Sequence, residues 1–188
     1  MFKLLNIEDL ESLARVIDGE LKGENTHFHN LVLDSRLPSK TSVFIALHGE
    51  KFDGNIYCSE ALSNGCCAVI TDDPSIIGRS ILVKDTYIAL LKLAKNQLNH
   101  VGPKTLAITG SNGKTTVKEM MGRILPSETT VITKDNENNE FGILYTVLKI
   151  KESTSHLILE CGARKNGDFD LIAKYLEFDA LVLINLNN

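Results

Sequence analysis

A short glycine-rich segment carries the residues best suited to bind a nucleotide. It follows the apolar run 105–109 and precedes a helical pattern. Glycine lets the backbone turn tightly and approach an anion, and the N–H groups at a helix N-terminus attract phosphates. Lys114 can reach the β- and γ-phosphates of ATP, and the Thr115 hydroxyl can bind Mg²⁺. The spacing predicts an ATP site made of Gly110, Ser111, Asn112, Gly113, Lys114, Thr115 and Thr116.

This loop is shorter than the common phosphate-binding pattern. That pattern has a glycine five residues before the second glycine of the loop, and Ile108 occupies this position here. A glycine-rich turn before a helix can also be a plain connection between elements. The strand pattern before the loop and the amphipathic helix pattern after it favour phosphate binding.

Three polar residues outside the loop are further candidates for binding a ligand or a metal. Glu160 ends the apolar run 157–159, and ligands of open α/β sheets bind at the carboxyl ends of strands. Its carboxylate is therefore placed to bind Mg²⁺, with a helix cap or a surface acid as the alternative. Asn138 and Asn139 carry amides that can bind a sugar or its phosphate, and either can instead cap the helix that follows.

Ser35 and Arg36 form a second candidate site in the first half of the chain. They follow the apolar run 31–33 and Asp34. The arginine fork suits a diphosphate or a partner carboxylate. The alternative is an ordinary Asp–Arg turn, because such tripeptides are common in turns.

The first half of the chain reads as a small α/β domain. A helix is expected between Asn6 as N-cap and Gly19, with an apolar face. Further helices are expected over 56–64 and 86–101, and strands over 31–33, 43–47, 68–70 and 81–83. Gly102-Pro103 then breaks the pattern, so we place a domain boundary there and expect domains of residues 1–102 and 103–188.

The second half alternates strictly between strands and helices. Strands are expected over 105–109, 131–132, 157–159 and 181–184, and helices over 114–125, 143–150 and 169–176. The strands are apolar on both faces, which is typical of a parallel sheet covered by helices. The chain stops at Asn187-Asn188, directly after a strand, so we expect this domain to be incomplete.

The composition is ordinary for a globular protein. The 188 residues are 43% hydrophobic and 23% charged, with a net charge of −4. This mild acidity disfavours a nucleic-acid partner. No apolar run is long enough to cross a membrane and the N-terminus does not resemble a signal peptide, so we expect a cytoplasmic protein. The four cysteines fit no zinc-binding spacing, and Cys66 and Cys67 are expected to be small buried side chains.

Four ordered segments resemble the Mur ligase family. Segment 108–120 is similar to the family's phosphate loop, and within the family to that of the members that add D-alanyl-D-alanine to UDP-N-acetylmuramoyl-tripeptide. The other three are Asp34-Ser35-Arg36 with 43–54, Asn138-Asn139-Glu140-Phe141-Gly142, and Glu160-Cys161-Gly162-Ala163 with Asn166-Gly167-Asp168. Cys161 replaces the family's usual leucine, and Asp168 its usual glutamate.

The resemblance implies an ATP-dependent ligase of peptidoglycan precursor synthesis that works through an acyl phosphate. It implies a UDP-sugar-binding domain followed by the start of a P-loop ATPase domain, with ATP and Mg²⁺ as cofactors. Lys114 would be catalytic, Thr115 and Glu160 would bind the metal, and Ser35, Arg36, Asn138 and Asn139 would bind the substrate. We expect these residues to lack the family's C-terminal domain and to be inactive alone, and we expect the intact protein to be a monomer.

Other interpretations stay open. The chain can be a non-catalytic relic that still binds the UDP-sugar or ATP, or a Mur ligase that adds a different amino acid. A P-loop kinase or GTPase is a further alternative, although the Asn-Lys-x-Asp signature of guanine binding is missing.

Overall fold

The computed structural model divides into two compact units, Met1–Leu93 and Ala94–Asn188. It describes residues 1–36, 39–49, 52–134, 137–163 and 167–185. Glu50, Lys51, Asn166, Asn187 and Asn188, which belong to segments singled out above, lie outside the described residues. The mixed α/β class with parallel sheets is confirmed. The units meet within one helix, α3, and a domain boundary at Gly102-Pro103 stays a prediction.

The first unit is built on a five-stranded sheet in the order β1-β7-β6-β3-β2. The β1–β7 pair is antiparallel and the other pairs are parallel. The strands are β1 (Glu20–Lys22), β2 (Asn30–Val32), β3 (Ser42–Ile45), β6 (Ala68–Thr71) and β7 (Ser80–Leu82), and a short hairpin joins β4 (His48–Gly49) to β5 (Phe52–Asp53). The helices are α1 (Leu10–Ile17), the 3-10 turn η1 (Gly54–Tyr57), α2 (Cys58–Ser63) and the start of α3 (Thr86–Val101).

The first helix begins later than expected. Asn6 is not its N-cap, because its backbone is left-handed, with φ of 52°. Asp9 caps α1 instead: its carboxylate accepts the Ser12 N–H at 2.8 Å, and the Ser12 side chain completes a capping box. The helix ends at Asp18, also left-handed, and the Gly19 N–H bonds to the Ala14 carbonyl. Local side-chain hydrogen bonds therefore set this helix start.

In the first unit Cys66 is buried as the sequence predicted, but the same prediction is wrong for Cys67. Cys58 and Cys66 are buried in one apolar cluster between the sheet and α2, with Val32, Phe44, Ala46, Ala61 and Val69. Burial raises the pKa of each of these two thiols to about 11. Cys67 is half-buried. These thiols stay protonated at neutral pH, which disfavours nucleophilic cysteine chemistry here.

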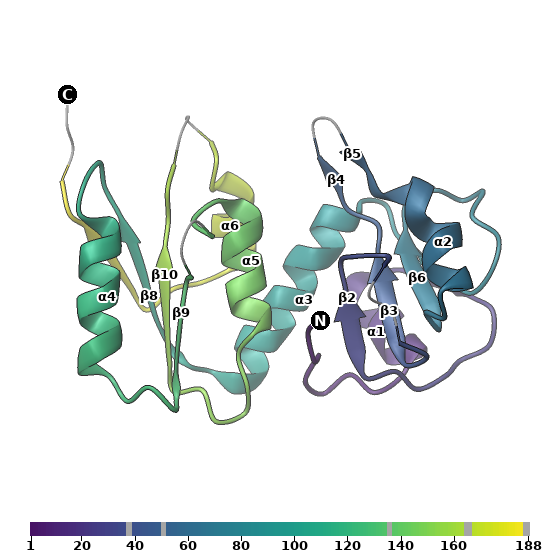
Figure 1. Cartoon of the computed structure of the whole chain (residues 1–188), viewed down its shortest axis with the longest axis horizontal. Helices are drawn as coiled ribbons and strands as arrows, with labels where there is room; N and C mark the ends of the chain where they lie inside the picture. The colour runs from purple at the N-terminus through teal and green to yellow at the C-terminus, as the bar shows by residue number, and fades with distance from the viewer. Residues whose placement is uncertain (37–38, 50–51, 135–136, 164–166, 186–188) are drawn as a thin grey trace. The chain divides into compact units, whose positions relative to one another are not determined.

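The second unit contains a fully parallel four-stranded sheet in the order β11-β8-β10-β9. The strands are β8 (Lys104–Thr109), β9 (Thr130–Ile132), β10 (His156–Glu160) and β11 (Ala180–Leu183). The helices are α4 (Lys114–Ile124), α5 (Glu140–Leu148) and α6 (Asp170–Tyr175). Figure 1 shows α4 on one side of this sheet and α5 on the other. The chain moves across the sheet in one direction from β8 to β9 and in the opposite direction from β9 to β10. Right-handed crossovers in opposite directions place their helices on opposite faces of the sheet.

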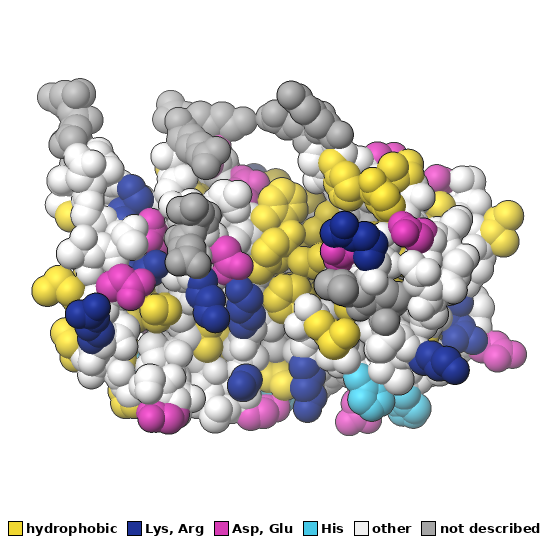
Figure 2. Space-filling model, in the orientation of Figure 1, with side chains coloured by type: hydrophobic (Ala, Val, Ile, Leu, Met, Phe, Trp, Pro, Cys, Tyr) yellow, Lys and Arg dark blue, Asp and Glu magenta, His cyan; other side chains and the backbone are white. Residues whose placement is uncertain are grey.

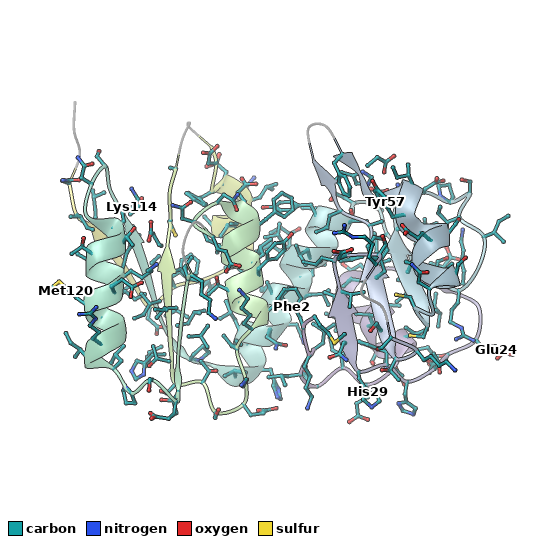
Figure 3. All side chains as sticks on the ribbon, viewed as in Figure 1. Phe2, Glu24, His29, Tyr57, Lys114 and Met120 are labelled. Carbon is teal, nitrogen blue, oxygen red and sulfur yellow. The ribbon has the colours of Figure 1, made fainter. Side chains whose placement is uncertain are left out.

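Helix α4 buries a different face from the one its apolar pattern predicts. Met120 and Ile124 are 58% and 74% exposed, and Figure 3 shows Met120 pointing outward from the helix. The buried residue of α4 is Lys118, at 1% exposure. Lys114, Lys118 and Met121 share one side of the helix through their spacing of three and four residues. The side toward the sheet is therefore partly basic.

A polar contact joins the starts of β8 and β11. The Asp179 carboxylate accepts the Thr105 N–H and the Thr105 hydroxyl, each at 2.8 Å, and the Lys104 ammonium at 3.3 Å. The hydrogen bonds from Thr105, with Lys104 adding to them, lower the pKa of Asp179 to about 2. The ionised carboxylate thus holds the edge strand β11 against β8.

We expect Asp179→Ala to lower the melting temperature at neutral pH by a few degrees, because the variant loses these charge-assisted bonds. A carboxylate with a depressed pKa stabilises the fold above its unfolded pKa, near 4, and loses that effect as the pH falls toward 2. The difference between the variant and the wild type should therefore shrink below about pH 4. Thermal melts from pH 6 to pH 3 measure it, with exposed Glu177→Ala as control. A difference that stays constant with pH would show that Asp179 acts through packing alone.

Candidate functional site

Three strands of the second unit end beside one another at the predicted ATP site. The phosphate loop follows β8, Glu160 ends β10, and residues 184–185 follow β11. The Thr109 hydroxyl donates to the Cys161 carbonyl at 3.0 Å, and the Ile184 N–H donates to the Thr109 carbonyl at 3.0 Å. The carboxyl edge of a parallel sheet is where such folds bind ligands. The topology therefore brings the loop and Glu160 together, as expected.

The loop has the backbone shape that its glycines were expected to allow. Gly110 and Gly113 have φ of 140° and 84°, in the region that favours glycine. A Cβ on Gly110 would lie 3.1 Å from the Asn185 backbone N and O atoms. Gly113 is also the N-cap of α4 and supplies no side-chain cap. The first N–H groups of α4 have no partner within the helix, and the exposed Thr115 and Thr116 lie there.

Lys114 is the first residue of α4, directly after Gly113. Figure 3 places it at the first turn of α4. Its ammonium donates to the Gly110 carbonyl at 2.6 Å and lies 3.4 Å from the Ser111 carbonyl. These contacts hold the positive charge against the loop backbone, where a bound phosphate chain would need it.

Asn185 is a contact of the loop that the sequence pattern did not reveal. Its backbone carbonyl accepts the Ser111 N–H at 3.0 Å, and its side-chain oxygen accepts the Asn112 N–H at 2.9 Å. Two amides of the predicted ATP site therefore already have acceptors. The amides at the start of α4, from Lys114 to Thr116, are the ones best placed to receive phosphate oxygens. The only signal in the sequence was the position of Asn185 directly after a strand.

Glu160 is almost fully buried, at 2% exposure, and neighbouring side chains orient it. Its Oε1 atom accepts the Thr115 hydroxyl at 3.1 Å and the Asn138 amide at 3.3 Å. Its backbone N–H donates to the Thr133 hydroxyl at 3.0 Å. The surface-acid alternative is therefore wrong for Glu160, and its role in binding Mg²⁺ stays a prediction.

The neighbouring residues Asn138 and Asn139 make different contacts. Asn138 donates to Glu160, and its carbonyl accepts the Gly162 N–H at 2.8 Å, which fixes it at the loop. The Asn139 side chain instead accepts the Gly142 N–H at 2.9 Å and caps α5. The helix-cap alternative therefore describes Asn139, and the structure brings Asn138 to the predicted metal ligands.

The spacing of the Thr115 hydroxyl oxygen and Glu160 Oε1 is suited to two ligands of one magnesium ion. Mg²⁺ prefers octahedral oxygen ligands at about 2.1 Å, so neighbouring ligands lie about 3 Å apart. The Thr115 hydroxyl oxygen and Glu160 Oε1 are 3.1 Å apart. Mg²⁺ commonly uses one or two protein ligands and completes its shell with phosphates and water. It therefore needs no cluster of three or more His, Cys, Asp or Glu side chains, and the described residues contain none.

Lys118 is the second residue that the sequence pattern missed. Its ammonium lies 3.6 Å from Glu160 Oε2 and 3.3 Å from Glu119 Oε1. Among the described residues, Oε2 of Glu160 has no hydrogen-bond donor. The two oxygens of Glu160 thus face different groups: Oε1 faces Thr115 and Asn138, and Oε2 faces Lys118.

The first unit has a separate pocket of about 440 Å³ that contains the other predicted site residues. Figure 2 shows apolar side chains beside basic and acidic ones on this unit's visible face. The pocket is lined by Leu33, Asp34, Ser35, Arg36, Phe44, Phe52, Tyr57 and Glu60. The Phe52 and Tyr57 rings stack with centroids 5.4 Å apart. The pocket thus combines aromatic side chains with polar and charged ones, as small-molecule sites do.

Ser35 and Arg36 already have partners within this pocket. The Arg36 guanidinium donates to both Asp34 oxygens, at 2.9 and 2.8 Å, and these bonds lower the pKa of Asp34 to about 2. Ser35 is buried, and its hydroxyl donates to Glu60 at 2.9 Å. The arginine side chain is 79% exposed, so its remaining N–H groups are open to a ligand. The Asp–Arg turn is thus observed, with Asp34 as the carboxylate partner of Arg36, and ligand binding by Arg36 stays a prediction.

The β4–β5 hairpin positions Phe52 at the pocket. His48 on β4 lies 3.0 Å from Asp72 and 3.2 Å from Asp53 through its two ring nitrogens. Asp72 also accepts the Asn55 amide at 2.8 Å. This network ties both strands of the hairpin to the segment after β6, although neither short strand was expected from the sequence.

Comparisons with known proteins agree on both halves of the chain. Residues 27–108 match the model described as "Mur ligase family, catalytic domain", and residues 108–188 match "Mur ligase middle domain". The chain is 36% identical, over 99% of its length, to UDP-N-acetylmuramoyl-tripeptide–D-alanyl-D-alanine ligase of Haemophilus influenzae. It is 36% identical, over 94% of its length, to the Bacillus subtilis enzyme of the same name. It spans 42% and 40% of these two relatives.

Solved structures show the same similarity. The UDP-N-acetylmuramoylalanyl-D-glutamyl-2,6-diaminopimelate–D-alanyl-D-alanyl ligase from Acinetobacter baumannii superposes with a TM-score of 0.85 and 30% identity, over 94% of this chain and 41% of that one. The MurF ligase from Thermotoga maritima in complex with ADP gives a TM-score of 0.75 and 33% identity, over 83% of this chain and 37% of that one. No helix in the described part of the chain is long and apolar enough to cross a membrane.

Proposed function

Because the chain belongs to the Mur ligase family, we propose that it supplies the UDP-sugar-binding and ATP-binding parts of a peptidoglycan-precursor ligase. The reaction joins D-alanyl-D-alanine to UDP-N-acetylmuramoyl-tripeptide at the expense of ATP. The observation that carries this is the meeting of Lys114, Thr115 and Glu160 at one sheet edge, in a chain whose relatives bear that enzyme's name over nearly its whole length. Residues 1–102 would bind the UDP-sugar and residues 103–188 would bind ATP.

The proposed chemistry is phosphoryl transfer followed by amide formation. The terminal carboxylate of the tripeptide attacks the γ-phosphorus of ATP, ADP leaves, and an acyl phosphate forms. The amine of D-alanyl-D-alanine then attacks the acyl carbon, phosphate leaves, and the amine loses a proton. Positioning and charge neutralisation supply most of the catalysis in such transfers. Lys114 would bind the β- and γ-phosphate oxygens and offset the negative charge that develops on them.

Thr115 and Glu160 would hold Mg²⁺ beside Lys114, and the bound ion would neutralise phosphate charge. Asn138 and Thr133 keep the Glu160 carboxylate in place, through its side chain and its backbone N–H. Ser111, Asn112 and Thr116 would contribute through the loop and the first turn of α4. Asn138 and Asn139 stay proposed as substrate contacts, although each also has the protein contact described above.

We propose the pocket of the first unit as the site for the UDP-sugar. The open N–H groups of Arg36 suit a diphosphate, and the Phe52–Tyr57 wall suits the ring of a nucleoside or sugar. The buried Ser35 fixes the turn on which Arg36 lies. The proposal includes a cytoplasmic location, where ATP is available, a monomeric intact protein, and no nucleic-acid partner.

A Mur ligase that adds a different amino acid is the second candidate. The chain is 34% identical over 146 residues to UDP-N-acetylmuramoyl-L-alanyl-D-glutamate–2,6-diaminopimelate ligase of Caldanaerobacter subterraneus. That match covers 73% of this chain, compared with 99% for the Haemophilus influenzae relative. The broader match favours D-alanyl-D-alanine as the added group.

Arg36→Ala tests the UDP-sugar site. We expect the variant to bind UDP-N-acetylmuramoyl-tripeptide roughly 10–100-fold more weakly than the wild type, because it loses charge-assisted hydrogen bonds worth about 1.5–3 kcal/mol. Titration calorimetry without ATP measures this, and exposed Arg15→Ala on α1 is the matched control. Equal affinities for the two variants would remove Arg36 from the site. An absence of binding by folded wild-type protein would place the UDP-sugar elsewhere.

A further inference from the structure

Lys118 is a buried lysine inside the proposed nucleotide site, and neither the phosphate-loop pattern nor the mechanism above uses it. At 1% exposure it is the most deeply buried charged side chain among the described residues, followed by Glu160 at 2%. Burial of an ammonium ion is costly unless an opposite charge accompanies it. Its position therefore requires a specific partner.

Two carboxylates lie near the Lys118 ammonium, and burial identifies Glu160 as its main partner. Glu119 Oε1 is nearer to the Lys118 ammonium, at 3.3 Å compared with 3.6 Å for Glu160 Oε2, but the Glu119 side chain is 50% exposed. An exposed ion pair contributes little, because water screens it. The Glu160 side chain is 3% exposed, and its Oε2 has no other donor among the described residues. In this low-dielectric place, each charge depends on the other.

The positive charge of Lys118 affects how strongly Glu160 can attract Mg²⁺. With Lys118 beside it, the Glu160 carboxylate is neutralised as a pair, so a free Mg²⁺ ion meets little net negative charge at Oε1. The phosphates of a nucleotide bring several negative charges to the same place. Mg²⁺ would then bind together with the nucleotide and not ahead of it.

We propose that Lys118 is the internal counter-ion of Glu160 and makes magnesium binding conditional on bound nucleotide. It acts as a positioning residue: it holds Oε2, while Oε1 stays directed at the Thr115 hydroxyl. This inference rests on the proposed function for the role of Mg²⁺, but the ion pair itself does not.

A double-mutant cycle tests the pair without any ligand. In EDTA, Lys118→Met should lower the melting temperature on the order of 10 °C, because it leaves a buried carboxylate alone. Lys118→Met with Glu160→Gln should regain at least half of that loss, since both charges are gone. Lys118→Met with Glu119→Gln is the matched control and should regain none of it.

The outcome remains readable if Lys118→Met does not fold. Folding of the Lys118→Met/Glu160→Gln protein, with failure of the Lys118→Met/Glu119→Gln protein, would give the same support. A Glu160→Gln double variant no more stable than Lys118→Met alone would overturn the ion pair.

Magnesium titrations without nucleotide test the conditional binding. Millimolar MgCl₂ should leave the wild-type melting temperature within about 1 °C of its value in EDTA, and should raise that of Lys118→Met by several degrees, because ligand binding to the folded state stabilises it. Equal responses of the two folded proteins would overturn the inference. Failure of the proposed function would appear separately, as a wild-type protein that binds no ADP even with Mg²⁺.

Discussion

Lys114→Ala should reduce the affinity of the 188-residue chain for ADP or ATP with Mg²⁺ by about 100-fold or more. In a full-length protein that contains this chain, it should abolish ATP-dependent turnover. The ammonium lies 2.6 Å from the Gly110 carbonyl, so it is already held at the loop that would receive the phosphates. Hydrogen bonds to charged groups are worth about 1.5–3 kcal/mol each, and the γ- and β-phosphates would accept more than one.

Calorimetry with each nucleotide measures the loss, and a thermal melt checks that the variant is folded. Lys174→Ala is the matched control, because this lysine is exposed on α6 and distant in sequence from the loop. A Lys114→Ala protein that binds and turns over normally would remove the phosphate-loop assignment.

Glu160→Gln should raise the magnesium concentration needed for nucleotide binding at least about tenfold. The substitution keeps the size of the side chain and the acceptor for Thr115, but removes the negative charge that Mg²⁺ prefers in an oxygen ligand. The substitution also takes the buried counter-ion from Lys118, so it should lower the melting temperature as well. The magnesium requirement is therefore compared only for protein that the melt shows to be folded.

Nucleotide binding at a series of MgCl₂ concentrations gives this value, beside a thermal melt of the same sample. Glu119→Gln is the control, because it removes the other carboxylate near Lys118 without touching the proposed metal ligands. An unchanged magnesium requirement in Glu160→Gln would make Glu160 a structural residue.

The sequence predicted the elements of the second unit well because their signals are local. The expected strand 105–109 is β8, the expected helix 114–125 is α4 with one residue fewer, and Glu160 ends its strand as expected. Gly110 and Gly113 have the left-handed backbones that the loop pattern requires. Apolar runs, glycine-rich turns and helix caps depend on neighbours along the chain, and a sequence displays those directly.

What the sequence could not show depends on strand register and helix rotation. Lys118 belongs to the site because α4 turns that side toward the sheet and because β10 pairs with β8, which places Glu160 level with Ile108. Asn185 reaches the loop because β11 is the other neighbour of β8. No sequence motif indicates either contact, because each contact joins residues that lie more than 40 positions apart in the chain.

The asparagine pair shows the same limit on a smaller scale. Both amides looked equally able to cap a helix or to bind a ligand. Only the close packing of residue 138 against Gly162 separates their roles, with Asn138 at Glu160 and Asn139 at α5. Short elements such as β1 and the β4–β5 hairpin were likewise missed, because their sequences, Glu-Leu-Lys, His-Gly and Phe-Asp, contain no apolar run.

Ligation by a full-length protein that contains this chain is the most direct measure of the proposed function. The reaction contains ATP, Mg²⁺, UDP-N-acetylmuramoyl-tripeptide and D-alanyl-D-alanine, and mass spectrometry follows the product while phosphate release is recorded. A parallel reaction offers UDP-N-acetylmuramoyl-L-alanyl-D-glutamate with 2,6-diaminopimelate. We expect one phosphate released per UDP-N-acetylmuramoyl-pentapeptide formed in the first reaction, and no product in the second. Product only in the second reaction, or phosphate release without product in either, would contradict the proposed function.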